Sequence, residues 1–491
     1  MATTLQLSAA DREFLGIVAE AAFSNPFTDR RLELDMKLAR CGPELPINDR
    51  VVRMVKHVGE RVVHLKTAGA ADVRRYAGPD REIVRATLLF DIYHRHLNAM
   101  DQLILDQVVA GERSLPVTFA DDVLGEFVQR GFPAPEATRL LAIFFQLRRA
   151  YYFIDRRLIG ASPCMKELRR RLWSNVFTDD VRWYEQRLWN RMEDFSTMLL
   201  GDTGTGKGTA AAAIGRSGFI PYDERGGCFA ESFVRTFVSL NLSQFPETLI
   251  ESELFGHKKG SFTGAISDHP GALARCSQHG AIFLDEIGDA TVPVQIKLLQ
   301  VLQERIFSPV GSHDRVRFAG RVIAATNKPL DDLRATGQFR SDFYYRLCSD
   351  VIAVPPLRQR IAEEPRELDE LLAGIVERLL GTSDSDLAGK VRERLLADVG
   401  RDYAWPGNVR ELEQATRRVL LTQHYTGDQK AVAPDLRSRL LAGVDAGNLD
   451  ADALLAGYCA LLYERHGTIE EVARRTNLDR RTVKAYLEKH Q

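Results

Sequence analysis

Residues 196–210 read STMLLGDTGTGKGTA, an apolar run followed by a glycine-rich turn and a lysine. The apolar part predicts a short buried strand, and the residues after Lys207 predict a helix. Glycines allow consecutive backbone N–H groups to point inward, and the helix N-terminus adds the positive end of its dipole, so the turn is a candidate phosphate-binding loop. Its candidate ligand-binding residues are Gly201, Asp202, Thr203, Gly204, Thr205, Gly206, Lys207, Gly208 and Thr209.

A second apolar run, residues 281–284, ends in Asp285 and Glu286. This pattern predicts a buried strand whose tip can hold Mg²⁺ through Asp285 and polarise a water molecule through Glu286. Lys207 would supply a point charge to the β and γ phosphates of a nucleotide. A chance glycine-rich turn is the alternative for the first motif, but the two motifs together favour ATP or GTP as the ligand.

Gly208 departs from the usual pattern of such loops. The residue after the lysine is normally Ser or Thr, whose hydroxyl reaches the metal, and here Thr209 comes one position later. Glycine also costs the following helix up to about 1 kcal/mol relative to alanine. Either Thr209 substitutes for the missing hydroxyl or the metal depends more on Asp285, and the sequence leaves both open.

Composition sets limits on compartment and partners. The chain has 491 residues, which predicts roughly three domains. Its 66 Lys and Arg balance 67 Asp and Glu, so contact with nucleic acid must come from a local patch. Six cysteines are scattered singly, which fits a reducing compartment and no zinc site. Without a signal-like start or a run of about 18 apolar residues, we expect a cytoplasmic protein and no membrane partner.

The hydrophobic pattern of the sequence changes along the chain. It predicts a multidomain fold of α and α/β parts. Residues 1–157 are helical in pattern; residues 86–109, for example, carry one amphipathic stripe. Apolar strands alternate with helical stretches over 158–360, which predicts a parallel α/β nucleotide-binding subdomain. Residues 361–425 are helical again, 426–448 read as a linker, and 449–491 form a short helical tail.

Eight motifs occur in order along the middle of the chain. They are GDTGTGK (201–207), FVSLN (237–241), ESELFGHKKGSFTGA (251–265), GAIFLDEIGD (280–289), RVIAATN (321–327), FRSDFYYRL (339–347), PPLRQR (355–360) and WPGNVRELE (405–413). Over about 160–425 the chain resembles the AAA+ domain of bacterial enhancer-binding activators, which act on sigma-54 RNA polymerase. The resemblance implies ATP as the nucleotide, with 361–425 as the helical lid of the AAA+ domain.

The resemblance also implies roles for five further residues. Asn327 would sense the γ phosphate, and Asn241 would switch Glu286 between idle and active orientations. Arg340 and Arg346 look like arginine fingers that enter a neighbouring subunit's site and neutralise charge on the transferring phosphoryl group. Arg410 would be a second sensor on the lid. A site completed by a neighbour implies a ring, with six subunits as the family expectation; without the resemblance these arginines would read as a solvated helix face.

The segment GHKKGSFTGA (256–265) places a phenylalanine on a glycine-rich bend, where it should be exposed. Exposed apolar groups usually mark a contact surface. The string looks like the GAFTGA loop of the same family with Ser261 in place of Ala, which implies that the loop contacts sigma-54. The candidate contact residues are Gly260, Ser261, Phe262, Thr263, Gly264 and Ala265; a surface hairpin with a stray aromatic is the alternative.

Two stretches lengthen the chain relative to the family pattern, around 178–195 and around 220–233. Neither contains one of the motifs above. We expect them to alter subunit packing or regulation.

The tail predicts three helices, at 449–467, 468–476 and 480–490, with Thr468 and Asp479 as helix caps. This is the spacing of a helix-turn-helix, similar to the Fis-type domain of the family, whose last helix would enter the major groove of double-stranded DNA. The candidate DNA-binding residues are Arg480, Arg481, Thr482 and Lys484. A packing or dimerisation unit is the alternative.

The first 157 residues do not resemble a phosphorylated receiver domain, because no βα alternation with a strand-end aspartate is present. We expect a helical domain that senses an unknown ligand or protein signal and controls the ATPase ring. Asp91, His94, His96 and Asp101 could suggest a metal site, but a solvated polar face is the favoured interpretation because His96 points elsewhere.

The sequence therefore predicts a DNA-bound, ring-forming ATPase that remodels sigma-54 polymerase at a promoter. One rival is a DNA-binding regulator that binds nucleotide but barely hydrolyses it, which only Gly208 supports. The second rival is an AAA+ remodeller that acts on a different protein and uses its tail for docking.

Overall fold

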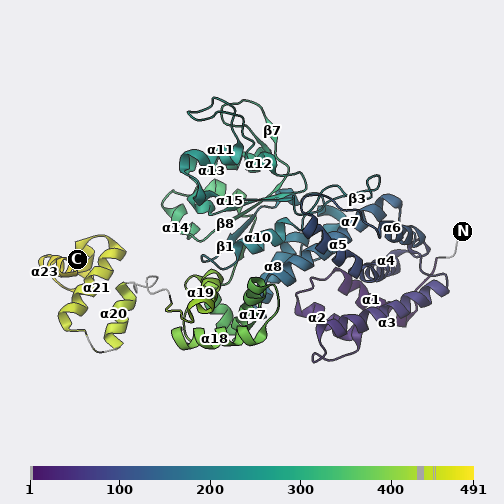
Figure 1. The fold of residues 1–491 in the computed structure, drawn as a ribbon, viewed down its shortest axis with the longest axis horizontal. Coiled ribbons are helices and arrows are strands. Elements are labelled where there is room, and N and C mark those ends of the chain that lie inside the picture. Colours follow the sequence, from purple (N-terminus) through teal and green to yellow (C-terminus); the bar gives the residue numbers. More distant parts are fainter. Residues whose placement is uncertain (1–3, 428–435, 446, 448, 491) are drawn as a thin grey trace. The chain divides into compact units, whose positions relative to one another are not determined.

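The computed structural model describes residues 4–427, 436–445, 447 and 449–490. It divides the chain into two compact units, Met1–Leu395 with Asp402–Thr422 and Leu396–Arg401 with Gln423–Gln491, and Figure 1 colours both along the sequence. No helix among these residues is both long and apolar enough to cross a bilayer.

The N-terminal part of the first unit is helical, as predicted. It comprises α1 (Ala9–Phe23), α2 (Asp29–Ala39), α3 (Ile47–Thr67), η1 (Val73–Arg75), α4 (Gly78–Arg95), α5 (Leu97–Ala110), α6 (Ala120–Gln129) and α7 (Ala134–Tyr151). The stretch 86–109 is not one helix, because the chain turns at His96 between α4 and α5. α7 continues into η2 (Tyr152–Arg156), a π-helical turn, a rare geometry that often occurs at functional sites.

The predicted parallel sheet is confirmed. Its five strands are β1 (Thr197–Leu200), β4 (Phe237–Asn241), β5 (Ala281–Asp285), β8 (Arg321–Thr326) and β9 (Asp350–Ala353). They are all parallel and lie in the order β4-β5-β8-β1-β9. β5 and β8 are apolar along almost their whole length and buried, as expected of central strands covered on both faces. The carboxyl ends of the strands meet at one edge, which is where ligands bind in open parallel sheets.

Helices and short segments surround the sheet. They are α8 (Pro163–Phe177), α9 (Val181–Trp183), η3 (Tyr184–Leu188), η4 (Met192–Asp194), α10 (Lys207–Gly215), η5 (Leu242–Gln244), α11 (Glu247–Phe255), α12 (Ala272–Arg275), η6 (Ile287–Asp289), α13 (Val292–Glu304), α14 (Leu330–Ala335) and α15 (Ser341–Leu347). Two small hairpins pair β2 (Tyr222–Asp223) with β3 (Cys228–Phe229) and β6 (Ile306–Phe307) with β7 (Val316–Arg317). Four helices follow, which lie in and just before the stretch 361–425 predicted as the helical lid: α16 (Leu357–Glu363), α17 (Glu367–Leu380), α18 (Ser385–Val399) and α19 (Asn408–Thr422).

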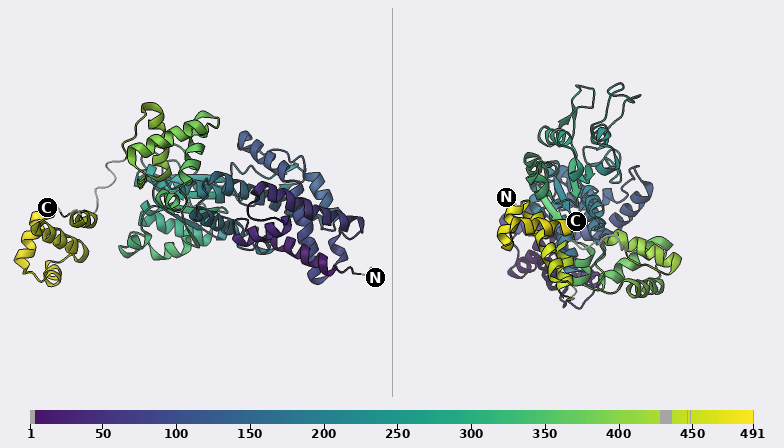
Figure 2. Two further views of the ribbon diagram at one scale, coloured as in Figure 1. Left: turned by 90° about the horizontal axis from the view of Figure 1, so that it is seen from below. Right: turned by 90° about the vertical axis from the view of Figure 1, so that its left-hand side faces the viewer.

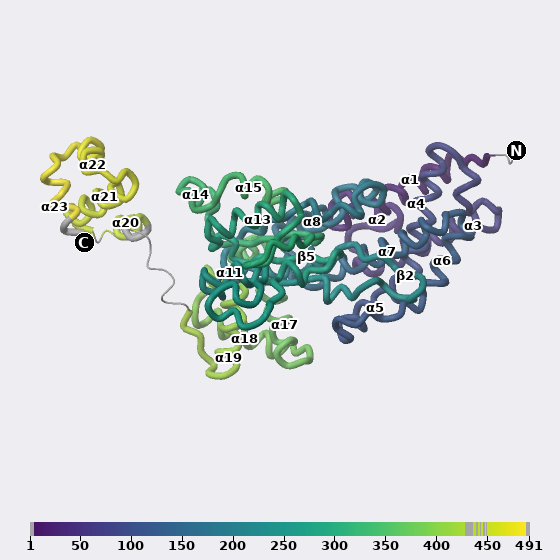
Figure 3. Tube along the Cα trace, turned by 90° about the horizontal axis from the view of Figure 1, so that it is seen from above, coloured from purple at the N-terminus to yellow at the C-terminus, as the bar shows by residue number. Residues whose placement is uncertain are grey.

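The N-terminal helices and one face of the sheet share a single buried hydrophobic cluster. Side chains of α7 and η2 pack in it together with those of β1, α10, β5 and β8. Figure 1 shows the purple-to-blue helices against α8 and α10, and Figure 3 shows β2 beside α7, two elements that are in contact. The helical part is therefore joined to the α/β part by a common core rather than by a tether.

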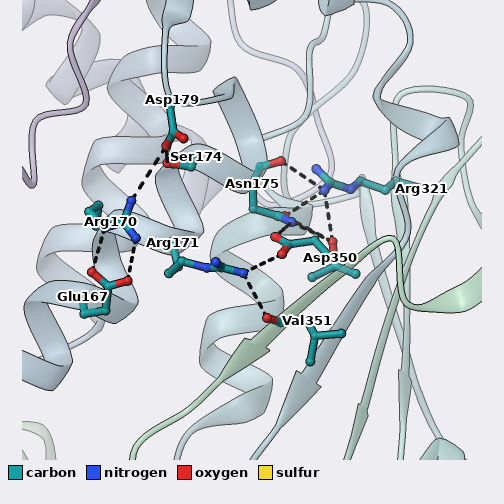
Figure 4. Close-up of polar contacts among 10 residues, drawn as sticks. Glu167, Arg170, Arg171, Ser174, Asn175, Asp179, Arg321, Asp350 and Val351 are labelled. Carbon is teal, nitrogen blue, oxygen red and sulfur yellow. Dashed lines mark hydrogen bonds and ion pairs between the residues drawn. The ribbon is translucent and has the colours of Figure 1, made fainter. Parts of the chain in front are cut away.

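Polar contacts fix α8 on the amino ends of the strands (Figure 4). The Asn175 amide donates to Asp350 at 2.8 Å, and its oxygen accepts from Arg321 at 2.7 Å. Arg321 also donates to Thr197 Oγ1 at 3.1 Å, and Arg171 pairs with Asp350 at 2.7 Å. These bonds satisfy the buried Arg321 guanidinium, whose unmet donors would otherwise cost free energy.

The second unit contains α20 (Leu436–Asp445), α21 (Ala451–His466), α22 (Ile469–Thr476) and α23 (Arg480–His490). The three predicted tail helices correspond to α21, α22 and α23, and they bury Cys459, Leu462, Val472 and Val483. α20 lies within the predicted linker 426–448, of which 428–435, 446 and 448 are outside the described residues.

Candidate nucleotide-binding site

The loop between β1 and α10 has the conformation of a phosphate-binding turn. Gly204 and Gly206 take left-handed φ angles of 80° and 103°, which non-glycine residues rarely adopt. Thr205 is buried and donates its hydroxyl to the Asp202 carbonyl at 2.9 Å. Because α10 begins at Lys207, the free N–H groups of its first turn adjoin the loop.

The two acidic residues after β5 lie beside this loop. Asn241 and Asp285 are register partners on β4 and β5, and the Asn241 amide donates to Asp285 at 3.4 Å. Glu286 is in a left-handed conformation with φ 55°, and its backbone N–H donates to the Asp285 carboxylate at 3.1 Å. Strain of this kind is concentrated at functional sites. The structure thus places the amide of Asn241 on Asp285.

Lys207 interacts electrostatically with both acidic residues of the site. Its ammonium is buried and donates to the carbonyls of Gly201 at 2.8 Å and Asp202 at 3.2 Å. Burial lowers its pKa, while Glu286 and Asp285 act in the opposite direction. Burial also raises the pKa of Glu286, against the influence of Lys207. A buried cation and a strand-end carboxylate pair are the groups that a nucleotide triphosphate and its Mg²⁺ require.

Two elements close over the loop. Asn327, after β8, donates its side-chain amide to Thr203 Oγ1 at 2.9 Å. The lid approaches so closely that a Cβ on Gly204 would lie 2.2 Å from the Gly407 carbonyl oxygen and 3.0 Å from the Cβ of Arg410. Arg410, predicted as a lid sensor, therefore lies next to the loop.

Asn408 joins the lid to the loop, and the sequence argument did not single it out. It is 1% exposed and has φ 54°. Its side chain donates to the Thr203 carbonyl at 3.0 Å and accepts from the Leu357 backbone N–H at 2.8 Å. The Asn that follows Pro-Gly in WPGN was the available signal, because Asn tolerates left-handed φ and makes local side-chain bonds.

Arg340 and Arg346 do not reach the loop of their own chain. Arg340 forms a two-point ion pair with Asp342, at 3.0 and 2.6 Å. Arg346 donates to the Leu302 carbonyl at the end of α13, at 3.2 and 3.0 Å. Its own carbonyl accepts from Ser196, which precedes β1, so Arg346 lies at the amino edge of the sheet, opposite the loop.

The segment between α11 and α12 and the β6–β7 hairpin project together from the α/β part (Figures 1 and 2). The Lys258 backbone N–H donates to the Val310 carbonyl at 3.0 Å. Gly260 and Gly264 have φ 80° and 103°, and the Gly260 N–H donates to the Ala265 carbonyl at 2.9 Å, which closes the tip.

At that tip, the Phe262 ring lies against His257, with centroids 4.9 Å apart, and remains 37% exposed. Thr263 is exposed. Ser261 packs against Gly311, where a Cβ would lie 2.5 Å from that of Ser261, and its hydroxyl is buried without a hydrogen-bond partner among the described residues.

In the second unit, the candidate DNA-binding residues lie within the first five residues of α23. Asp479 caps the helix by accepting from the N–H groups of Arg481 and Thr482, both at 3.0 Å. The Thr482 hydroxyl also bonds Asp479, at 2.6 Å, and Arg480 pairs with Glu470 at 3.4 Å. Arg481 and Lys484 are exposed.

The prediction of a solvated polar face in the N-terminal helices is wrong. Asp91 is buried and pairs with Arg95 at 3.0 Å, and Asp101 pairs with Arg148. His94 donates from Nδ1 to the Phe90 carbonyl at 2.8 Å, and burial lowers its pKa to about 3. Over the described part of the chain, no group of three or more His, Cys, Asp or Glu could hold a metal ion.

Comparison with known proteins gives a family for this chain. The family described as Sigma-54 interaction domain matches residues 182–353. The sigma54-dependent transcriptional activator SfnR of Pseudomonas putida is 37% identical over 282 residues, which are 56% of this chain and 71% of SfnR. The chain belongs to the sigma-54-dependent transcriptional activators.

Other known proteins match parts of the chain as well. The Nif-specific regulatory protein of Azotobacter vinelandii is 39% identical over 274 residues, 55% of this chain and 45% of that protein. The chain thus spans about half the length of that relative. Among solved structures, NtrX from Brucella abortus in complex with ATP aligns with a TM-score of 0.41 and 21% identity, over 75% of this chain and 80% of that chain.

Proposed function

We propose that this chain is an activator that binds upstream DNA and uses ATP hydrolysis to remodel sigma-54 RNA polymerase for promoter opening. The observation that carries this proposal is the convergence of Lys207, Asp285 and Glu286 at the carboxyl edge of the sheet. Family membership supports sigma-54 polymerase as the partner. Six singly placed free cysteines support a cytoplasmic location.

The residues of the loop fit a nucleotide and a metal. Residues 201–209 and Lys207 would bind the phosphates, and Asp285 would hold Mg²⁺, which neutralises charge on the transferring phosphoryl group when bound. Glu286 would accept a proton from the attacking water, and its raised pKa suits that role near neutral pH. Asn327, which lies against the loop, would report on the γ phosphate, and Arg410 would be a second sensor of the nucleotide on the lid.

A ring, with six subunits as the family expectation, is supported by the positions of Arg340 and Arg346. Both lie away from the loop of their own chain, so they are available to a neighbour. Arg340 must leave Asp342 to do so. In its bound position such an arginine stabilises the transition state.

The contacts with other macromolecules would come from the loop tip of the first unit and from the helices of the second unit. Residues 260–265 at the loop tip would contact sigma-54, with Phe262 and Thr263 as the gripping side chains. The first five residues of α23 would read double-stranded DNA through Arg481, Lys484 and Arg480, with Thr482 limited by its bond to Asp479. The N-terminal helices would receive an unknown ligand or protein signal.

The deciding experiment is ATP-dependent open-complex formation by sigma-54 polymerase on supercoiled promoter DNA. We expect wild type to open the promoter, Thr263→Ala to hydrolyse ATP without opening it, and Glu286→Gln to do neither. Thr118→Ala, which changes an exposed threonine in the turn before α6, serves as the control and should behave as wild type.

The same assay separates the alternatives. A wild-type protein that binds ATP without hydrolysing it would support the non-hydrolysing regulator, for which Gly208 is the motive. Hydrolysis without any engagement of sigma-54 in the presence of the natural signal would indicate a different client protein.

A further inference from the structure

The helix that carries the phosphate-binding lysine is held at its other end by the N-terminal helices. α10 begins at Lys207 and ends at Gly215. Just beyond its end, Gln146 of α7 donates to the Ser217 carbonyl at 2.8 Å, and Arg149 of α7 donates to the Gly218 carbonyl at 2.7 Å. Both side chains are 1% exposed. Thus α7 contacts the carbonyl end of the helix whose amino end adjoins the phosphate-binding loop.

Burying the guanidinium of Arg149 at this position costs free energy. Its guanidinium contacts the rings of Phe145 and Phe233, at 5.1 and 5.5 Å from their centroids. Its Nε and Nη1 atoms are buried without a hydrogen-bond partner in the described part of the chain, and burial lowers its pKa. Isolating a charge in this way is costly unless its neighbours compensate, which the helix C-terminus and the aromatic faces do in part.

A series of side chains in contact leads from Arg149 to β5, the strand that ends in Asp285. Phe233, from the second inserted stretch, packs edge-on against Phe153 of η2 with centroids 5.6 Å apart. Arg216, directly after α10, lies over Phe153 at 5.7 Å and over Phe237 of β4 at 5.9 Å. Phe237 in turn stacks on Phe283 of β5 at 6.1 Å. We call the series Arg149, Phe233, Phe153, Arg216, Phe237 and Phe283 the cation–aromatic stack.

Two glycines of α10, Gly215 and Gly208, allow the helix to pack closely against the last two rings of this stack. A Cβ on Gly215 would lie 2.3 Å from the Phe237 ring, so any other residue there would have to displace that ring. A Cβ on Gly208 would lie 3.9 Å from Phe283, an ordinary contact distance. Phe283 precedes Asp285 by two residues on the same strand. The stack therefore contacts α10 near both of its ends, and its last ring lies two residues before Asp285, the aspartate proposed to hold Mg²⁺.

We propose that Arg149 is a positioning residue for the nucleotide site, and that the cation–aromatic stack couples the N-terminal helices to the phosphate-binding loop. This inference rests on the proposed function of nucleotide hydrolysis. A helix of 9 residues is a rigid rod of about 13 Å, so a displacement of its carbonyl end moves Lys207 at its amino end. A signal that shifts α7 would then change nucleotide affinity without touching the nucleotide.

The test compares two neighbouring arginines of α7 in the full chain. Arg149→Met removes the contact with Gly218 and the cation at the start of the stack, whereas Arg148→Met removes an ion pair with Asp101 and a contact with the Tyr151 ring, neither of which involves α10. The readouts are the affinity for a fluorescent N-methylanthraniloyl ATP, the KM and kcat of ATP hydrolysis, and the thermal unfolding midpoint. We expect Arg149→Met to weaken nucleotide affinity and raise KM by about fivefold or more, the lower end of common coupling strengths. We expect Arg148→Met to stay within about twofold of wild type, because it does not adjoin α10.

A conservative variant separates positioning from general damage. Arg149→Lys keeps the charge and a donor for the Gly218 carbonyl, and it should recover most of the affinity. If Arg149→Met does not fold, Gln146→Met replaces it under the same criteria; it loses the Ser217 contact and the hydrogen bond from the Tyr184 hydroxyl, and it leaves Arg149 in place. Equal losses of stability in the Arg149 and Arg148 variants with unchanged nucleotide affinity would overturn the inference. Absence of nucleotide binding by the wild type would instead overturn the proposed function.

Discussion

Gly208 is the residue at which the phosphate-binding loop departs from the general pattern, and the structure shows no steric need for it. Among the described residues, only the Phe283 ring comes near a Cβ placed there. We expect Gly208→Ala to stabilise the chain by up to about 1 kcal/mol, because alanine is the better helix former. Gly208→Ser should in addition lower the Mg²⁺ concentration needed for half-maximal ATP hydrolysis, because it supplies the hydroxyl that usually reaches the metal.

The two variants are matched, so the comparison isolates the hydroxyl. Urea unfolding checks the stability, and Mg²⁺ titrations of the ATPase rate check the metal. Identical Mg²⁺ dependence in the Ala and Ser variants would mean that the metal already has its ligands, with Asp285 and Thr209 as the candidates.

His94 makes the N-terminal helices sensitive to acid. Burial lowers its pKa to about 3, whereas in the unfolded chain it titrates near its ordinary value of about 6.5. The folded state therefore keeps its full stability above about pH 6.5 and loses it as pH falls from there toward 3, by at most about 1.4 kcal/mol per pH unit. His94→Gln should flatten the pH dependence of the thermal unfolding midpoint between pH 6 and pH 4.

Exposed His64 provides the control, since His64→Gln should leave that pH dependence as in wild type. The same slope in both variants would exclude His94 as the source. Arg31 and Arg148 also disfavour the protonated ring, so their partners Asp35 and Asp101 must be kept intact in the comparison.

At the level of elements, the projecting loop is tied to its neighbouring hairpin through one close approach. Gly311 has φ 77°, and a Cβ there would collide with Ser261 at 2.5 Å. We expect Gly311→Ala to displace the loop, because both strain and collision oppose the packed position. Faster tryptic cleavage after Lys258 and Lys259 would report the displacement, while the ATPase rate should change little.

Gly337→Ala separates strain from collision. Gly337 has a similar φ of 73°, and a Cβ there would have no described atom within 4 Å, so this variant carries the backbone cost alone. Cleavage after Lys258 should then proceed at the wild-type rate. Equal cleavage in wild type and Gly311→Ala would mean that Ser261 and Gly311 do not hold the loop down.

Local pattern was enough to predict the elements that carry the site. The apolar runs of β1, β5 and β8 and the acids or amides that follow them are readable because buried parallel strands leave a strong apolar signal. Contacts between distant segments leave no such signal. The ion pair that occupies Arg340, the bond from Asn408 to Thr203 and the turn at His96 depend on neighbours that only the folded chain supplies.

At the scale of the whole molecule, the two inserted stretches have a structural role that composition could not indicate. In the first, Tyr184 donates its hydroxyl to Gln146 at 2.9 Å, and the buried Glu185 pairs with Arg85 at 3.0 Å. In the second, the Gly227 carbonyl accepts from the Val117 N–H at 2.9 Å. Both stretches thus bind the N-terminal helices to the α/β part.

This shared core makes the two ends of the chain respond differently to truncation. A chain that begins at residue 158 would expose Phe233, Ile214 and Tyr184, which are now at most 2% exposed. We expect it to aggregate or to bind a dye for exposed apolar surface, because a patch of this kind is not tolerated in water. A chain that ends at residue 427 removes most of the second unit and should keep the nucleotide affinity of the full chain.

Size-exclusion chromatography, dye binding and nucleotide titration of the two truncated chains check this prediction together. A chain from residue 158 that is monodisperse and unfolds at the same temperature as the chain ending at 427 would contradict a common core. If the core is common, removal of the N-terminal helices destroys the ATPase whether or not they regulate it. Their regulatory role must then be measured by substitutions such as Arg149→Met in the full chain, where the fold is kept and only the contact with α10 changes.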